Sequence, residues 1–250
     1  MARDRAGDVD FARPKTVSEV IGDALRCYRR YPVLFAEITL AVVVPYALVV
    51  YLADRDSLLG LRASSGSAAL VVFLLDVLLV GPLISALHIH ALTEIAAGRE
   101  PNVLEVFLRG LRVLPVVAAA QIVAGLLTGL GFVALIVPGL FLYARWGVVA
   151  QAAAVDRVDW RGALRRSAEL TAGQYLHVLG VLFTVGIFTG VLDSGAGALV
   201  TSSPTGWQVL TGIVVETVTL SVGALTSAML FFDLRARRPG PPQASESTSS

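Results

Sequence analysis

Three charged side chains, Asp76, Arg145 and Glu216, lie deep inside apolar stretches of this 250-residue chain. Charged groups are costly inside a bilayer, and each one there indicates either a structural ion pair or a functional polar site. At about 1.5 Å per helical residue, we expect them about 12, 9 and 14 Å below the outer ends of their helices. These depths predict a polar cluster in which Arg145 either pairs with a carboxylate or holds a substrate, proton or lipid headgroup.

Histidines raise the question of a metal site. His90 and Glu94 share a helical face, but His88 points about 200° away from His90. A zinc site needs three or four ligands, so we expect no metal at this point. His177 stands alone and is expected to be a packed or interfacial histidine.

Four common catalytic and cofactor-binding motifs are absent from the sequence. The sequence lacks a P-loop, a dinucleotide-binding fingerprint, a G-x-S-x-G elbow and an H-E-x-x-H motif. We therefore expect no enzyme activity and no cofactor. Nucleic-acid binding is not expected either, because the cations are spread along the chain and do not form one groove-sized patch.

The elements that must position these residues are membrane helices. The chain is 55% hydrophobic and 16% charged, whereas soluble domains are about 25% charged. A bilayer core requires about 20 helical residues, and six apolar blocks come near this length. The sequence predicts an all-α integral membrane protein, with the dipeptide Pro138-Gly139 as a tight hairpin between the third and fourth helices. The six blocks are Val33–Ala53, Ala68–Leu87, Val113–Val137, Gly139–Val155, Tyr175–Leu192 and Trp207–Phe232.

The distribution of Lys and Arg predicts the orientation. Seventeen of the 20 cations fall in segments on one side of the six helices, and only Arg55 and Arg62 fall on the other side. By the positive-inside rule, both termini should be cytoplasmic. We expect a multi-pass protein of the cell (inner) membrane, with segments 1–15 and 239–250 disordered on either side of a single domain, 16–238.

Three cytoplasmic segments look alike. Residues 16–32 have a capping-box pattern, Thr16 and Glu19, and an apolar stripe opposite arginines. LRCYRRYP (25–32) aligns with LRGLRVLP (108–115), and Leu164-Arg165 aligns with Leu108-Arg109. The pattern predicts three amphipathic interfacial helices and a possible threefold repeat, although chance similarity or plain juxtamembrane anchors would explain it too. The arginines expected to contact anionic lipid headgroups are Arg26, Arg29, Arg30, Arg109, Arg112, Arg165 and Arg166.

Glycine spacing predicts close packing of two helices. Gly125-x-x-x-Gly129 and Gly186-x-x-x-Gly190 have the spacing at which membrane helices approach closely. The single cysteine, Cys27, excludes an internal disulfide and is expected to be an inert small residue.

Several motifs together resemble a known family. They are SEVIGDALRCYRRYP, LIVPGLFLYARW, GALRRSAELTAGQYLHVLGVL and LFFDLRARR, in this order along residues 16–238. This set resembles a bacterial family of six-helix membrane proteins named after the membrane domain of glycerophosphoryl diester phosphodiesterase. In members that are phosphodiesterases, catalysis belongs to a separate soluble barrel. We expect no such barrel here, because 15 residues precede the resemblance and 12 follow it.

The resemblance thus implies a fold and a location, and it carries over no catalytic residues. The expected function is a non-enzymatic structural or accessory role at the lipid bilayer, with membrane lipids as partners. The alternative is a transporter or lipid-handling protein with a polar intramembrane site around Arg145.

Overall fold

The computed structural model describes residues 11, 13–53, 70, 73–156, 158–201 and 204–238. Within these ranges the regular elements are all helical. They are α1 (Val17–Arg30), α2 (Pro32–Ala53), the π-helix η1 (Asp76–Val80), α4 (Gly81–Ala96), α5 (Val103–Ala134), α6 (Ile136–Arg145), α7 (Val149–Val155), α8 (Trp160–Thr171), α9 (Tyr175–Val200) and α10 (Thr205–Ala236).

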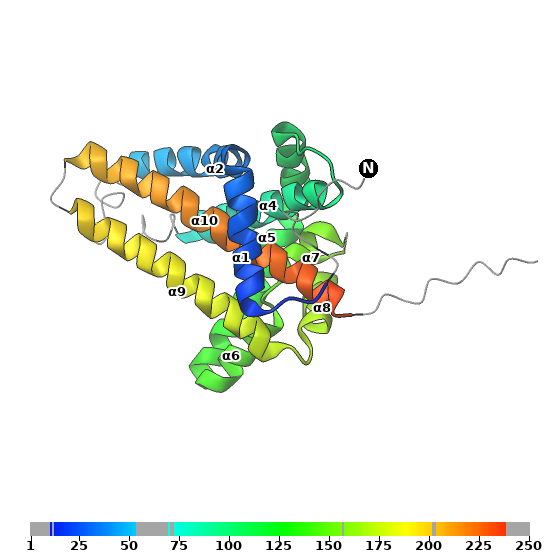
Figure 1. Ribbon diagram of the computed structural model, residues 1–250. Coiled ribbons are helices and arrows are strands. Elements are labelled where there is room, and N and C mark those ends of the chain that lie inside the picture. Colours follow the sequence, from blue (N-terminus) through cyan, green and yellow to red (C-terminus); the bar gives the residue numbers. More distant parts are fainter. Residues whose placement is uncertain are drawn as a thin grey trace, which may run out of the picture.

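In the part of the chain that the structure describes, six helical segments are long and apolar enough to cross a membrane, as the sequence predicts. The helices α9 and α10 pack side by side and run antiparallel, α2 packs along α10, and α1 lies across α10 (Figure 1). The α9–α10 turn marks one end of the bundle, which we call the turn end. The opposite end, which holds α8 and the C-terminal end of α10, is called the α8 end.

The first helix forms as its capping residues predict. Thr16 accepts a hydrogen bond from the backbone N–H of Glu19, and the Glu19 carboxylate accepts one from the Thr16 N–H at 2.8 Å. The apolar stripe of α1 packs on α9 and α10, which buries Val20, Ala24 and Cys27. The stripe therefore covers protein and leaves the arginines outside.

Order begins before residue 16. The ring of Phe11 packs against that of Phe232 with centroids 5.3 Å apart, and the side chain of Lys15 is buried. The expectation that the chain is disordered up to residue 15 is wrong for these two residues, because α10 provides a surface that the sequence pattern did not reveal. Residues 239–250 lie outside the described residues.

The hairpin between α5 and α6 turns at Leu135, three residues before the predicted position. Leu135 is extended, with φ −165° and ψ 152°, and Pro138 is the third residue of α6. Proline is tolerated there because the first turn of a helix has no acceptor for its N–H. Gly139 permits the crossing, since a Cβ at this position would come within 2.4 Å of the Phe132 ring.

The predicted fourth span is not one continuous helix. A three-residue turn at 146–148 separates α6 from α7. The ten residues of α6 extend about 15 Å, half of a bilayer core. The first six residues of α7, Val149 to Ala154, are all buried between α4 and α5.

Two other expectations change. Residues 108–112 belong to the first part of the continuous 32-residue helix α5, which passes through Pro115, so they are not a separate surface helix. The Gly125/Gly129 and Gly186/Gly190 pairs do not mediate packing among the described residues, because a Cβ at any of the four would meet nothing within 4 Å there.

Candidate functional site

Arg145 lies at the α8 end of the bundle. It is the last residue of α6, it is half-buried, and its guanidinium carbon is 5.9 Å from the centre of the Phe141 ring. Arg145 forms no ion pair with any residue that the structure describes.

Two buried hydroxyl groups of α8 hold the end of α6 in place. Ser167 and Thr171 donate hydrogen bonds to the carbonyl oxygen of Arg145, at 3.1 and 3.0 Å. The last carbonyl oxygens of a helix accept no hydrogen bond within the helix. The two hydroxyls of α8 provide the missing donors for the carbonyl at the end of α6. Sequence reasoning missed both residues, although Ser167 belongs to the ALRRS motif.

The rest of that motif explains the shape of α8. Ala163 and Leu170 are buried against the bundle, and Asp159 caps the helix by accepting from the Gly162 N–H at 2.8 Å. Gly173 follows the helix with φ +77°, a left-handed conformation that favours glycine. The chain can therefore leave α8 and enter α9 within three residues.

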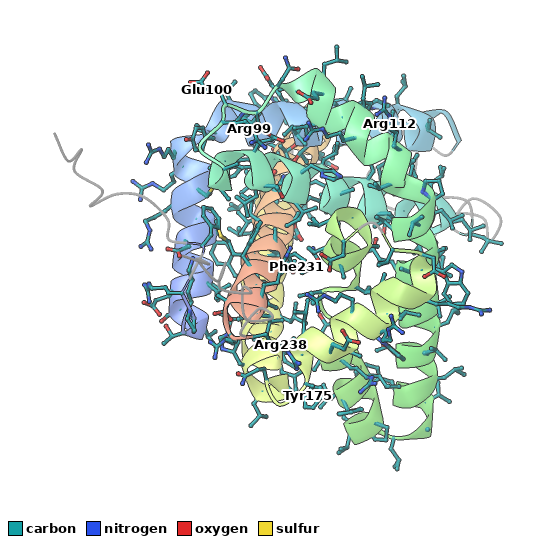
Figure 2. The ribbon with its side chains drawn as sticks, turned by 90° about the vertical axis from the view of Figure 1, so that its right-hand side faces the viewer. Arg99, Glu100, Arg112, Tyr175, Phe231 and Arg238 are labelled. Atoms are coloured by element: carbon teal, nitrogen blue, oxygen red, sulfur yellow. The ribbon has the colours of Figure 1, made fainter. Side chains whose placement is uncertain are left out.

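Arg145 lines a cavity of about 520 Å³, which we call the basic pocket. Its wall combines the end of α6, one face of α8 and the segment that follows α10. The lining residues are Arg145, Trp146, Leu164, Arg165, Ala168, Glu169, Ala172 and Arg238. Figure 2 looks onto this end and shows Arg238 just beyond α10, near Tyr175 at the start of α9.

The basic pocket carries an excess of positive charge. Three arginines and one glutamate line it, which leaves a formal charge of +2. The Glu169 carboxylate lies 3.7 Å from the Arg165 guanidinium and 3.6 Å from that of Arg166, so these two arginines share its single negative charge. Among the described residues, the only acceptor of the Arg238 guanidinium group is the carbonyl oxygen of Ala172, at 3.4 Å. Two guanidinium groups, those of Arg145 and Arg238, are thus left without a carboxylate among the described residues.

The predicted cluster of Arg145 with Asp76 and Glu216 does not form. Glu216 interacts electrostatically with Asp76 and Asp193. Twenty residues, or about 30 Å of helix, separate Glu216 from the end of α10 at Ala236, beside the basic pocket. The prediction failed because it measured depth along an unbroken fourth helix, whereas α6 ends after ten residues at the α8 end.

The arginines expected to contact lipid differ in their surroundings. Arg26 pairs with Asp23, Arg109 with Glu94 at 2.6 Å, and Arg166 with Asp156 at 3.2 Å. Arg30 stacks over Tyr31, with its guanidinium carbon 5.8 Å from the ring centre. Arg29 and Arg112 are exposed and form no ion pair in the described ranges.

The histidines of α4 have structural neighbours. His88 is fully buried, stacks on Phe35 with ring centroids 5.5 Å apart, and donates a hydrogen bond from Nδ1 to the Ile84 carbonyl oxygen at 2.9 Å. Glu94 turns toward Arg99 and Arg109. Among the residues that the structure describes, no three potential metal ligands gather at one point.

A buried ionic network joins the N-terminal segment to the end of α10. The Asp233 carboxylate accepts from the Lys15 N–H at 2.6 Å, lies 2.8 Å from the His177 ring and pairs with Arg237 at 2.9 Å. The Lys15 ammonium pairs with Asp23 at 2.6 Å. His177, expected to stand alone, is therefore a hydrogen-bond partner of Asp233, which the sequence could not reveal because Asp233 is 56 residues away.

Comparison with protein-family models, curated proteins and solved structures finds no match for this chain.

Proposed function

We propose that this protein is a non-enzymatic membrane protein that binds the headgroup of an anionic phospholipid in the basic pocket. The observation that carries the proposal is the convergence of Arg145 and Arg238, both without a carboxylate partner in the described chain, on one cavity of about 520 Å³. Arginine is suited to phosphate because its planar guanidinium group donates two parallel hydrogen bonds.

The surroundings of the pocket favour a lipid over a soluble anion. Trp146 lines it, and tryptophan is enriched at the level of lipid headgroups. The neighbouring α5–α6 hairpin exposes Val133, Leu135, Ile136 and Val137, with 68–86% of each residue accessible. A phosphate bound between Arg145 and Arg238 would leave acyl chains free to follow this apolar surface.

The proposal places the α8 end on the cytoplasmic side of the cell membrane, with both termini there. The support is the distribution of Lys and Arg, of which seventeen fall on one side of the predicted helices and two on the other. In this orientation Arg145 lies on the side that carries the seventeen. In this orientation α1, α8 and the start of α5 lie near the anionic leaflet, and their arginines attract lipid by about 1 kcal/mol each. The threefold repeat and the kinship with the phosphodiesterase membrane-domain family belong to the same proposal and rest on the sequence motifs alone.

The test is a lipid titration of the purified protein in neutral detergent. We expect short-chain phosphatidylglycerol to raise the unfolding temperature and change tryptophan fluorescence, and phosphatidylcholine to do neither. The double variant Arg145→Gln/Arg238→Gln should bind phosphatidylglycerol at least tenfold more weakly, since one charged hydrogen bond contributes about 1.5–3 kcal/mol. Arg145→Lys should recover part of the loss, because it keeps the charge and loses the bidentate geometry.

The matched control is Arg29→Gln/Arg112→Gln, which removes two exposed arginines outside the pocket. A neutral detergent micelle has no anionic surface to attract them, so we expect this variant to bind phosphatidylglycerol like the parent protein. Equal weakening by both double variants would mean that binding depends on net charge alone, and the pocket would lose its role. A parallel titration with inorganic phosphate separates the two sources of the anion. Binding of phosphate as tight as that of the phospholipid would replace the lipid with a soluble anion.

A further inference from the structure

The basic pocket carries more positive charge than one phosphodiester neutralises. A phosphodiester lipid such as phosphatidylglycerol has a single negative charge on its phosphate. Three arginines and one glutamate give the lining a formal charge of +2, so a bound phosphodiester leaves one positive charge without a counter-charge. A phosphomonoester carries a charge of about −1.5 to −2 near pH 7 and has three strong acceptor oxygens. Its charge therefore matches that of the lining.

Arg165 supplies the additional positive charge. Its side chain is 82% exposed, and the carboxylate of Glu169 is 3.7 Å away, which is longer than a hydrogen bond. The charge of Glu169 is also shared with Arg166, at 3.6 Å. Electrostatic attraction acts through space over about 8–10 Å at ordinary ionic strength. Arg165 therefore does not have to touch a phosphate that Arg145 and Arg238 hold.

The rest of the lining offers little to a polar headgroup. The side chains of Trp146, Leu164, Ala168 and Ala172 contain no hydrogen-bond acceptor, and Glu169 is held between two arginines. A phosphodiester lipid brings a second alcohol, such as glycerol, whose hydroxyl groups need acceptors once they lose water. A polar group buried without a partner costs free energy. A phosphomonoester has no second alcohol, so its phosphate can enter the pocket alone.

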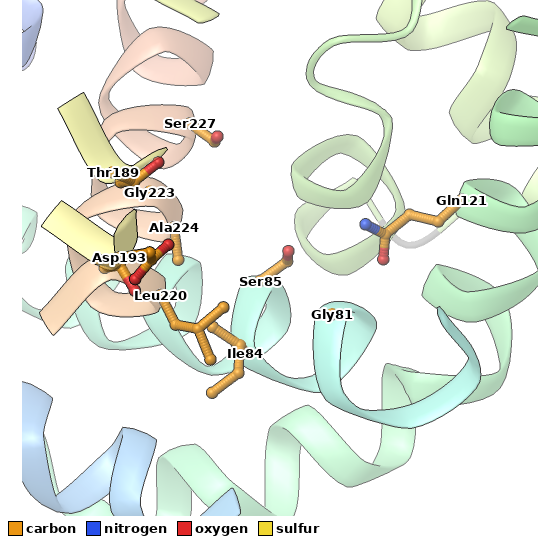
Figure 3. A pocket seen from close by; sticks show the side chains of 11 residues that line it. Gly81, Ile84, Ser85, Gln121, Thr189, Asp193, Leu220, Gly223, Ala224 and Ser227 are labelled. Atoms are coloured by element: carbon orange, nitrogen blue, oxygen red, sulfur yellow. The ribbon is translucent and has the colours of Figure 1, made fainter. Parts of the chain in front are cut away.

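A second cavity, with a volume of about 320 Å³, carries the opposite charge. Figure 3 shows Gln121 of α5 on one side of it and Asp193 and Thr189 of α9 on the other. Asp193 is its one ionisable lining residue among those that the structure describes. An acidic wall repels anions, so an anionic probe should discriminate between the two cavities and occupy the basic pocket.

We infer that the basic pocket selects lipids that end in a phosphomonoester, the class of phosphatidic acid, over lipids with a phosphodiester headgroup. Arg145 and Arg238 hold the phosphate, and Arg165 stabilises its second negative charge. The inference rests on the proposed function, since it requires that a phospholipid occupies the pocket.

The test compares dihexanoyl phosphatidic acid with dihexanoyl phosphatidylglycerol, which have the same acyl chains. Both are titrated into the purified protein in neutral detergent, with tryptophan fluorescence as the readout. At pH 8 we expect phosphatidic acid to bind at least tenfold more tightly. The second ionisation of a phosphomonoester has a pKa of about 6, so phosphatidic acid is chiefly a monoanion at pH 5. Its advantage over phosphatidylglycerol should therefore fall about five- to tenfold between pH 8 and pH 5.

The direction of this change distinguishes titration of the lipid from titration of the protein. The acidic and histidine side chains on α8, on the turn before it and at the adjoining ends of α9 and α10 are Asp156, Asp159, Glu169, His177 and Asp233. Protonation of any of them makes this end of the protein more positive. That change would raise the preference for a dianion, so a fall in the preference identifies the lipid phosphate as the group that titrates.

Variants of α8 test the role of the second charge. Arg165→Gln should lower the preference for phosphatidic acid at pH 8 at least fivefold, and Arg165→Lys should keep most of it. Glu169→Gln should strengthen binding of phosphatidic acid, because it removes the negative charge of the lining. The matched control is Arg161→Gln, since Arg161 is an exposed arginine of the same helix that stacks over Trp160 and does not line the pocket. It should leave the preference unchanged, and thermal unfolding checks that every variant is folded.

The outcomes separate this inference from the proposed function. Equal affinity of the parent protein for the two lipids at pH 8 would overturn the selectivity and leave the proposed function standing, whereas binding of neither lipid would overturn both. A preference that does not vary with pH, or that Arg165→Gln and Arg161→Gln lower equally, would also overturn the inference. Monobutyl phosphate should bind at least tenfold more weakly than phosphatidic acid. Equal binding of the two would replace the lipid with a soluble phosphomonoester.

Discussion

The backbone N–H of Lys15 donates a 2.6 Å hydrogen bond to the carboxylate of Asp233, across 218 residues of chain. The Asp233 side chain has no accessible surface and also pairs with His177 and Arg237. One buried carboxylate at the α8 end therefore contacts the N-terminal segment through Lys15, α9 through His177 and α10 through Arg237.

Asp233→Asn should strongly destabilise the fold. Removing one partner of a buried ion pair leaves an uncompensated charge and typically costs about 3–5 kcal/mol. Thermal unfolding in detergent measures the loss. Glu100→Gln, at an exposed carboxylate with no ion pair in the described residues, is the control and should unfold like the parent protein. Equal unfolding temperatures for both variants would show that the network does not hold the end together.

The stability contribution of Glu19 should disappear in acid. A hydrogen bond from the Thr16 backbone, followed by one from Arg13, lowers the pKa of Glu19 from 4.5 to about 2. Because the pKa is lower in the folded state, the contribution is complete above pH 4.5 and is lost as the pH falls toward 2. The difference in unfolding temperature between the parent protein and Glu19→Gln should shrink over this window. A difference that does not vary with pH would contradict this assignment.

Gly139→Ala should destabilise the α5–α6 hairpin. The new Cβ would come within 2.4 Å of the Phe132 ring and 2.8 Å of its backbone nitrogen. Overpacking of this kind costs about 1–3 kcal/mol. Gly125→Ala, where a Cβ meets nothing within 4 Å, should be neutral or slightly stabilising, since alanine favours helix. The two unfolding temperatures, compared side by side, check the prediction.

Ser167→Ala/Thr171→Val should loosen the basic pocket without changing its charge. The pair removes both hydrogen bonds to the Arg145 carbonyl, each contributing about 0.5–1.5 kcal/mol. We expect lower stability and weaker binding of phosphatidylglycerol. Thr184→Val, whose hydroxyl bonds only its own helix at the Gly180 carbonyl, is the control for loss of a hydroxyl. Unchanged lipid affinity in the double variant would show that Arg145 does not need this support.

Labelling of introduced cysteines can test the proposed orientation, because the single native cysteine should not react. Burial raises the pKa of Cys27 to about 12, so the native thiol should not react with maleimides near neutral pH. Thr201→Cys should be labelled in intact cells by a membrane-impermeant maleimide, and Ser18→Cys only after permeabilisation. The opposite pattern would invert the topology.

Local patterns predicted the parts of the fold that depend on neighbouring residues. The capping box of α1 was readable because Thr16 and Glu19 are three residues apart, and the apolar segments were readable from their length. Arg145 was misplaced because the turn after Trp146 has no strong sequence signal and tertiary packing decides where α6 ends. The pairing of His177 with Asp233 depends on a contact between distant helices, so no local pattern could reveal it.

The docking of α1 on α9 and α10 sets an order of events during synthesis. Ribosomes add about 5–20 residues per second, so the 218 residues between Lys15 and Asp233 take on the order of 10–45 s to make. The surface that buries Val20, Ala24 and Cys27 is complete only at the end of this interval, when α10 has followed α9 out of the ribosome. The first helix to leave the ribosome is therefore among the last to reach its final position, and a nascent chain stopped before α10 must keep the apolar stripe of α1 in contact with lipid or a chaperone.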